Sequence, residues 1–411
     1  MIHASRLHRR TCLGFALGLV TDLAIPHGLD EPDASGEEAA SGDLPRLNYR
    51  VVHHFTDEEG TERPSGIVLA SDGRGYGTNT SGGEFGRGTV FSINGAKQVR
   101  VLHAFRGKPH DGSGPESSLV EADDGALYGT TPAGGSANFG VAYRLAHGGM
   151  TILHEFGVTP GDGQYVSGGL IFASDAQFYG VASRGGAHDL GMVFRMDKAG
   201  NVTPVWQFGD SRNDPAWPGA PVREGADGRL YGTAFGPYAG VIYSVAKDGS
   251  DPRVLHLFKD DVEGAPGATP MTIGSDGRIY GVNDYGAPGS WGRVYELHPD
   301  DSVTVLYTFD GSDGDFPNEV LEYKPGVLIG TTLTGGSSKP DSDGVVYMLH
   351  RDGRFRTLHT FSYTQRHRGE RELCEPAGAL LLGPGGQVTG TCGAGGRYGN
   401  GGIFTLVPVS A

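Results

Sequence analysis

The chain has 411 residues, of which 71 are glycine; its formal net charge is −15 and 37% of it is apolar. Abundant glycine without a collagen period or a charge excess indicates tight turns between short strands, and excludes collagen-like and disordered chains. The acidic balance disfavours nucleic acid and anionic membrane surfaces as partners. No helical apolar stripe follows residue 45, so we predict an all-β protein.

The first 26 residues have the pattern of an export signal. Arg9-Arg10 precede the apolar run "TCLGFALGLV", which is too short to span a bilayer comfortably. The pair resembles a twin-arginine signal, and a plain secretory signal is the alternative. Residues 27–45 are predicted to be an acidic linker. We therefore expect a periplasmic or secreted protein whose mature chain has no membrane span.

Two cysteines follow the predicted signal. Cys374 and Cys392 lie 18 residues apart, near the end of the chain. An even number of cysteines in an oxidising compartment predicts a disulfide between them. Two independent buried thiols are the alternative.

A phrase of the type "RVLHAF" recurs along the chain. It ends at Phe55, Phe105, Phe156, Phe208, Phe258, Phe309 and Phe361, with spacings of 50, 51, 52, 50, 51 and 52 residues. Repeats of this length indicate a propeller or a solenoid.

Each unit contains four predicted strands. An apolar run such as "SLVEA" leads through an Asp-Gly turn, such as Asp124-Gly125, to a segment like "LYGTT". Asp-Gly between apolar runs is a strong hairpin signal. A glycine-rich loop then leads to the third strand, "GVAYRL", and a short turn to the fourth. We predict that residues 46–411 form a seven-bladed β-propeller with four antiparallel strands per blade.

The ends of the repeat predict how the ring closes. The last unit stops at "GIFTLVPVSA" without a fourth strand, and an orphan fourth strand, "YRVVHHF", precedes the first unit. The N-terminal strand is therefore expected to complete the last blade and remove two open edges. A parallel β-helix is the alternative fold, but it needs no complementary half-unit at its ends.

Three repeated residue types receive structural interpretations. The tyrosine of the "LYGTT" segment is expected to pack between blades with its hydroxyl bonded, and the glycine after it to mark close approach of blades. Four histidines on fourth strands fall on different blades, so they are not expected to converge on a metal. They are His103, His154, His256 and His359.

The combination of "LH-x-F", "DG-x-LYGTT-x-x-GG" and "G-x-VF-x-L" resembles the bacterial GloVer tandem-repeat family over residues 49–406. That resemblance implies an exported, propeller-like protein and implies no reaction. The chain departs from the pattern where "LIGTTLTGG" and "VTGTCGAGG" lack the tyrosine, and it ends without a C-terminal sorting signal.

Function is expected on one face of the propeller, where interblade loops and the loops between second and third strands emerge together. The interblade loops are acidic. Asp310, Asp313 and Asp315 in "DGSDGD" are candidate oxygen ligands for Ca²⁺, the one ion considered, and no other cofactor is predicted. A solvated turn in which aspartates cap their own backbone is the alternative.

Residues that break the sevenfold pattern on this face are the candidate site residues. For elimination from a uronate polysaccharide, the candidates are Arg184 as the cation, His188 as the base and the neighbouring Asp189. Candidate binding residues are His110, Asp111, Tyr165, Trp217, Tyr238, Trp291, Arg397 and Tyr398.

Three functions remain open on the sequence. The first is a non-catalytic module that binds a glycan or a cell-surface protein on the acidic loop face. The second is a carbohydrate-active enzyme, a polysaccharide lyase above all, and the third is a purely structural surface protein. A propeller by itself decides among none of them.

Overall fold

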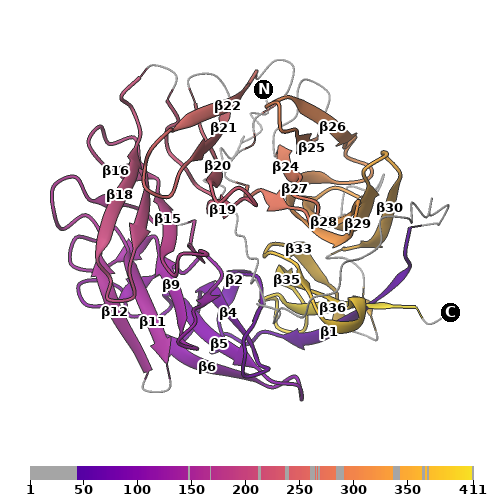
Figure 1. Cartoon of the computed structure of the whole chain (residues 1–411). Coiled ribbons are helices and arrows are strands. Elements are labelled where there is room, and N and C mark those ends of the chain that lie inside the picture. Colours follow the sequence, from indigo (N-terminus) through magenta and orange to yellow (C-terminus); the bar gives the residue numbers. More distant parts are fainter. Residues whose placement is uncertain are drawn as a thin grey trace, which may run out of the picture.

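The computed structural model describes residues 44–146, 149–166, 168–211, 214–236, 240–259, 264, 266, 269–283, 291–336, 343–362, 366–367 and 370–409. These residues form seven antiparallel sheets arranged as blades around a ring (Figure 1). The predicted seven-bladed β-propeller with four strands per blade is therefore confirmed.

The blades follow one another along the chain, each from its inner to its outer strand. Blade 1 contains β2 (Thr61–Pro64) with β3 (Val68–Leu69), β4 (Gly75–Ser81), β5 (Thr89–Ile93) and β6 (Val99–Ala104). Blade 2 contains β8 (Val120–Glu121), β9 (Leu127–Thr131), β11 (Val141–Ala146) and β12 (Gly149–Glu155). Blade 3 contains β14 (Leu170–Phe172), β15 (Phe178–Ala182), β17 (Met192–Met196) and β18 (Val202–Gln207). Blade 4 contains β19 (Arg223–Glu224), β20 (Leu230–Ala234), β21 (Gly240–Val245) and β22 (Arg253–Phe258).

The remaining blades have the same order. Blade 5 contains β23 (Thr272–Ile273), β24 (Ile279–Asn283), β25 (Arg293–Leu297) and β26 (Val303–Thr308). Blade 6 contains β27 (Asp315–Lys324), β28 (Val327–Thr334), β29 (Val345–His350) and β30 (Phe355–Thr360). Blade 7 contains β33 (Leu373–Pro376) with β34 (Leu381–Leu382), β35 (Val388–Gly395), β36 (Gly402–Pro408) and the N-terminal β1 (Leu47–His54).

Short two-stranded ladders lie outside the sheets of the blades. They are β7 (Gly112–Ser113) with β10 (Ala133–Gly134), β13 (Gly163–Gln164) with β16 (Arg184–Gly185), and β31 (Arg366–His367) with β32 (Glu370–Arg371). One 3₁₀ turn, η1, spans Pro384–Gly386. Within the described segments, no helix has the length and apolar character needed to cross a membrane.

The first and last strands of the chain close the ring. β1 pairs antiparallel with β36 from Leu47 opposite Pro408 to His54 opposite Gly402, and the two strands lie side by side in Figure 1. The Phe55 N–H donates to the Gly401 carbonyl at 3.1 Å. The N-terminal strand therefore completes blade 7, as the repeat boundaries predict.

The glycine after the repeated tyrosine has a different role from the predicted one. Gly129 lies opposite Tyr143 on the neighbouring strand, and a Cβ on Gly129 would lie 2.5 Å from the tyrosine Oη. The close approach is thus within one sheet, where a third-strand ring covers the glycine. The seven pairs are Gly77–Phe91, Gly129–Tyr143, Gly180–Phe194, Gly232–Tyr243, Gly281–Tyr295, Gly330–Tyr347 and Gly390–Phe404.

The inner strands bring buried charges to the middle of the ring. Arg223 in blade 4 donates from Nη2 to Glu319 Oε1 in blade 6 at 2.8 Å, and both side chains are buried. Glu116 of blade 2 also lies on an inner segment, and its Oε2 has no hydrogen-bond partner among the described residues. Burial raises the pKa of Glu116 to about 7, and the positive charge of Arg63 opposes that rise.

Substitution Glu116→Gln is expected to stabilise the protein at alkaline pH only. A carboxyl whose folded pKa lies above its unfolded value favours folding below the unfolded value, near 4.5, and loses that contribution as the pH rises toward 7. The amide stays neutral throughout, so we expect a gain of about 1–2 kcal/mol in unfolding free energy at pH 8 and none at pH 4.5. Denaturant unfolding of both proteins at the two pH values measures this, and an equal shift at both would contradict it.

Candidate functional site

Contacts between the fourth strands and the interblade loops recur from blade to blade and shape the loop face. In blade 3 the loop after Phe156 turns around Asp162, whose Oδ2 accepts a hydrogen bond from His154 Nε2 at 3.1 Å and from the Gly157 N–H at 2.9 Å. Its Oδ1 accepts from the Gly163 N–H at 2.8 Å. The buried carboxylate therefore ties the fourth strand to the loop that follows.

The same pairing recurs around the ring. Comparable contacts join His53 to Glu59, His103 to Asp111, Tyr307 to Asp313 and His359 to Glu372. In each of the seven blades a β-bulge between the third and fourth strands precedes this position, and a bulge re-aims the side chain that follows it. Many loop carboxylates thus hold the loops in place, so fewer of them are available to bind a ligand than the loop sequences suggest.

Two predicted site residues in one loop have different environments. Asp111 is buried and accepts hydrogen bonds from His103 at 3.0 Å and from the Arg106 N–H at 2.9 Å, so it anchors its loop. Burial by itself raises the pKa of Asp111. The hydrogen bonds from the His103 imidazole and from backbone N–H groups outweigh this effect, so the pKa of Asp111 lies below its usual value. His110 beside it is exposed. Of the pair, only His110 faces solvent as a ligand-binding residue would.

The three aspartates considered for Ca²⁺ are engaged separately. Asp310 Oδ1 accepts from the N–H and hydroxyl of Ser312, at 2.9 and 2.6 Å. Asp313 accepts from the Tyr307 hydroxyl, and Asp315 from the Thr334 hydroxyl at 3.2 Å. No group of three or more His, Cys, Asp or Glu side chains in the described part of the chain is placed to hold a metal ion.

The predicted disulfide is not formed: Cys374 and Cys392 are buried free thiols. In the β33–β35 ladder Cys374 lies opposite Ala394, and Cys392 lies opposite Pro376. The two cysteines are therefore diagonal neighbours, whose Cα atoms are typically about 7–8 Å apart. That separation exceeds the usual span of a disulfide, about 4.4–6.8 Å.

Exposed aromatic side chains gather on the loop face. They lie in interblade loops or in loops between second and third strands, and are between 36% and 55% exposed. These side chains are Phe85, Tyr165, Trp217, Phe235, Trp291 and Tyr398. Such rings offer apolar contact area with little conformational freedom to lose on binding.

Four residues on paired segments of blades 3 and 4 are called here the aromatic cluster: Tyr165, Arg184, Trp217 and Phe235. Arg184 lies 5.2 Å from the ring centroid of Trp217. It pairs in the β13–β16 ladder with Gln164, the neighbour of Tyr165. Ala216, the neighbour of Trp217, forms a β-bridge with Phe235. The structure thus brings Arg184 and Trp217 of the predicted set into contact, while the ring of Tyr165 packs against Phe139 at a centroid distance of 5.3 Å.

The proposed acid–base residues have separate partners. Arg184 Nη1 lies 3.8 Å from Asp189 Oδ2, whereas His188 Nε2 lies 2.9 Å from Asp210 Oδ1. All four side chains are substantially exposed. The Oδ1 atom of Asp189 also accepts a hydrogen bond from the Gly185 N–H at 3.0 Å, which holds the loop between these two residues. Each predicted catalytic cation or base therefore already contacts a carboxylate.

The other predicted binding residues are spread around the face. Trp291 packs onto Gly311, where a Cβ would lie 3.1 Å from the indole. The backbone N–H of Trp291 donates to the Phe309 carbonyl at 3.1 Å. Arg397 and Tyr398 are exposed in the corresponding loop of blade 7. Tyr238 lies outside the described residues. Phe235 was not predicted, because nothing in its sequence neighbourhood marks it as exposed.

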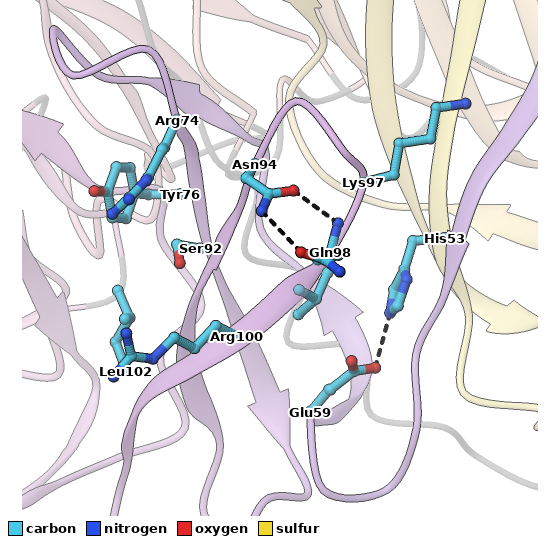
Figure 2. A pocket seen from close by; sticks show the side chains of 11 residues that line it. His53, Glu59, Arg74, Tyr76, Ser92, Asn94, Lys97, Gln98, Arg100 and Leu102 are labelled. Atoms are coloured by element: carbon cyan, nitrogen blue, oxygen red, sulfur yellow. Dashed lines mark hydrogen bonds and ion pairs between the residues drawn. The ribbon is translucent and has the colours of Figure 1, made fainter.

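Two hollows differ in their relation to this face. One, of about 380 Å³, lies beside the aromatic cluster and is lined by the loop 157–162, Gln164, Gly185, Gly186 and Asp189. The other, of about 700 Å³, lies on blade 1 (Figure 2). The apolar residues that line it belong to two different core clusters. Tyr76 and Leu102 pack in the cluster between blades 1 and 2, whereas Val99 packs in the cluster between blades 1 and 7. Of the two, the smaller hollow is the one that includes a predicted site residue, Asp189.

Comparison with known proteins identifies the repeat. No curated protein matches the chain. Among solved structures, the extracellular domains of the two-component systems BT3049 and BT4673 from B. thetaiotaomicron align with TM-scores of 0.57 and 0.56 at 12% and 11% identity. They cover 89% and 88% of this chain, which spans 42% of each of theirs. At this identity the likeness concerns the fold alone.

The profile of one family covers the whole described part of the chain in two successive matches. The matches span residues 42–237 and 218–411, and the family is described as the Gloeobacter/Verrucomicrobia repeat. The chain belongs to the Gloeobacter/Verrucomicrobia repeat family.

Proposed function

We propose that the chain is an exported, non-catalytic module that binds a glycan on its loop face. The observation that carries this proposal is the set of exposed aromatic side chains on loops of a rigid ring. Sugar rings present C–H faces that stack on such side chains, and the polar groups around them give orientation. Export is proposed from the signal-like residues 1–26.

Polysaccharide elimination receives less support from the same geometry. That reaction needs a base beside the acidic C–H and a cation beside the uronate carboxylate. The cation Arg184 already faces Asp189, and the base His188 already bonds Asp210. The exposed carboxylates of Asp189 and Asp210 stand beside these two groups and repel a uronate carboxylate, so binding without turnover is the function that we favour.

Affinity electrophoresis of the full chain tests the proposal. Gels would contain one soluble polysaccharide each: glucomannan, xyloglucan, laminarin, polygalacturonate or alginate. We expect retarded migration with at least one polymer, without oligosaccharide release or ultraviolet absorbance from an unsaturated uronate. Migration that no polymer retards would contradict glycan binding, and product formation would show an enzyme.

A further inference from the structure

In six of the seven blades, a described residue at the start of the inner strand adopts a left-handed conformation. The described residues there, with their φ angles, are Arg63 (34°), Gly114 (65°), Tyr165 (58°), Trp217 (51°), Phe316 (52°) and Glu375 (54°). Residues with a side chain are disfavoured in this region, whereas glycine adopts it freely. Among these six described residues, only that of blade 2 is glycine, which adopts the conformation without strain.

The ring itself imposes this conformation. The N–H of the residue donates to a loop carbonyl of the preceding blade: Gly114 to Arg87 at 2.9 Å, Tyr165 to Phe139 at 2.9 Å and Trp217 to Leu190 at 2.7 Å. The Tyr165 carbonyl also accepts from the Ser183 hydroxyl at 3.1 Å. Because the backbone contact is the same with glycine, the side chain is not needed to form it.

Tyr165 and Trp217 therefore place large aromatic rings where folding favours glycine. Both rings remain about two-fifths exposed, at 42% and 41%, so they bury less apolar surface than a core residue would. Backbone strain combined with an exposed aromatic ring points to a ligand rather than to stability.

The surroundings of these two rings define the ligand class. The hollow beside them has a floor of glycine-rich main chain and the polar side chains Gln164 and Asp189. Arg184 stacks on Trp217 and faces Asp189, so its charge is balanced. With histidine counted as neutral, Arg184, Asp189 and Asp210 together leave one negative charge at this exposed edge, on a chain of net charge −15. This field repels polyanions.

We infer that Tyr165 and Trp217 form the principal sugar subsite of the loop face and that this subsite takes an uncharged sugar. The inference rests on the proposed function and narrows it. The rings stack on the apolar faces of successive sugar units, while Gln164 and Asp189 bond their hydroxyl groups. Uronate polymers are excluded by charge.

Substitutions Tyr165→Gly and Trp217→Gly test the inference, because they remove the ring and relieve the backbone at once. Affinity electrophoresis in neutral glucomannan, xyloglucan or laminarin should show binding weakened about tenfold or more, as expected for one lost stacking contact. The melting temperature should stay equal or rise. Glu375→Gly is the matched control, since it relieves the same strain in blade 7 and should leave binding unchanged.

Each outcome discriminates. Glycan binding that survives both glycine substitutions, or is equally weakened by Glu375→Gly, overturns the inference and leaves the proposed function standing. Preferential retention by polygalacturonate or alginate overturns the ligand class. A marked fall in melting temperature in both variants assigns the rings to stability instead. Wild-type migration unaffected by any polymer overturns the proposed function together with the inference.

Discussion

A chain that begins at Phe55 is expected to lose a large part of its stability. It lacks β1, which supplies the outer strand of blade 7 and pairs with β36 along its length. Leu47 is buried, and Tyr49 stacks on His359 at a centroid distance of 3.8 Å. The lost apolar burial amounts to roughly 5 kcal/mol or more in unfolding free energy, and the exposed edge of β36 favours aggregation.

Thermal and denaturant unfolding measure this effect. The matched control begins at residue 44 and loses only residues that precede the described structure, so it should melt like the full chain. If the chain that begins at Phe55 melted at the same temperature as this control, the closed ring would be wrong.

Substitution Gly129→Ala is expected to destabilise blade 2 by about 3 kcal/mol, in the upper range for overpacking a core. The new Cβ would lie 2.5–2.6 Å from Oη and Cζ of Tyr143 and 2.8 Å from Leu119. Tyr143 is fully buried, so its ring has no free space to enter. Gly95→Ala is the control, because no atom lies within 4 Å of its Cβ position.

A double-mutant cycle shows whether the tyrosine ring causes the loss. With Tyr143→Ala, the ring is gone and Leu119 can move into the space it leaves, so the effect of Gly129→Ala should become small. Equal effects in the two backgrounds would assign the loss to the backbone and contradict the ring-over-glycine arrangement.

The blade count and the closure follow from the sequence because both are periodic. Seven closing phenylalanines mark the units, and an unmatched fourth strand at Tyr49 complements an incomplete last unit. The packing of the Tyr143 ring over Gly129 is harder to predict from the sequence. Glycine and an aromatic residue recur at these places in every unit, and periodicity alone does not tell which repeated residues touch. Pairing register supplies that information.

The site was only partly predictable, for physical reasons. Trp217 and Tyr165 stand out because they break the repeat, but their left-handed backbone depends on carbonyls of another blade. Asp111 looks like a free ligand-binding carboxylate in the sequence, yet His103 and a loop N–H use it. The offset of eight residues between histidine and loop carboxylate, shared by His103–Asp111 and His154–Asp162, was a signal available for two loops, whereas the other blades use different offsets.

Tryptophan fluorescence during titration with an oligosaccharide of the retained neutral polymer tests the central claim most directly. The indole of Trp217 reports on the aromatic cluster, whereas that of Trp291 lies against Gly311 in another part of the face. We predict a saturable spectral change in the wild-type protein and in Trp291→Phe, and none in Trp217→Phe. A change that persists in Trp217→Phe and disappears in Trp291→Phe would contradict the assignment of the subsite to blades 3 and 4.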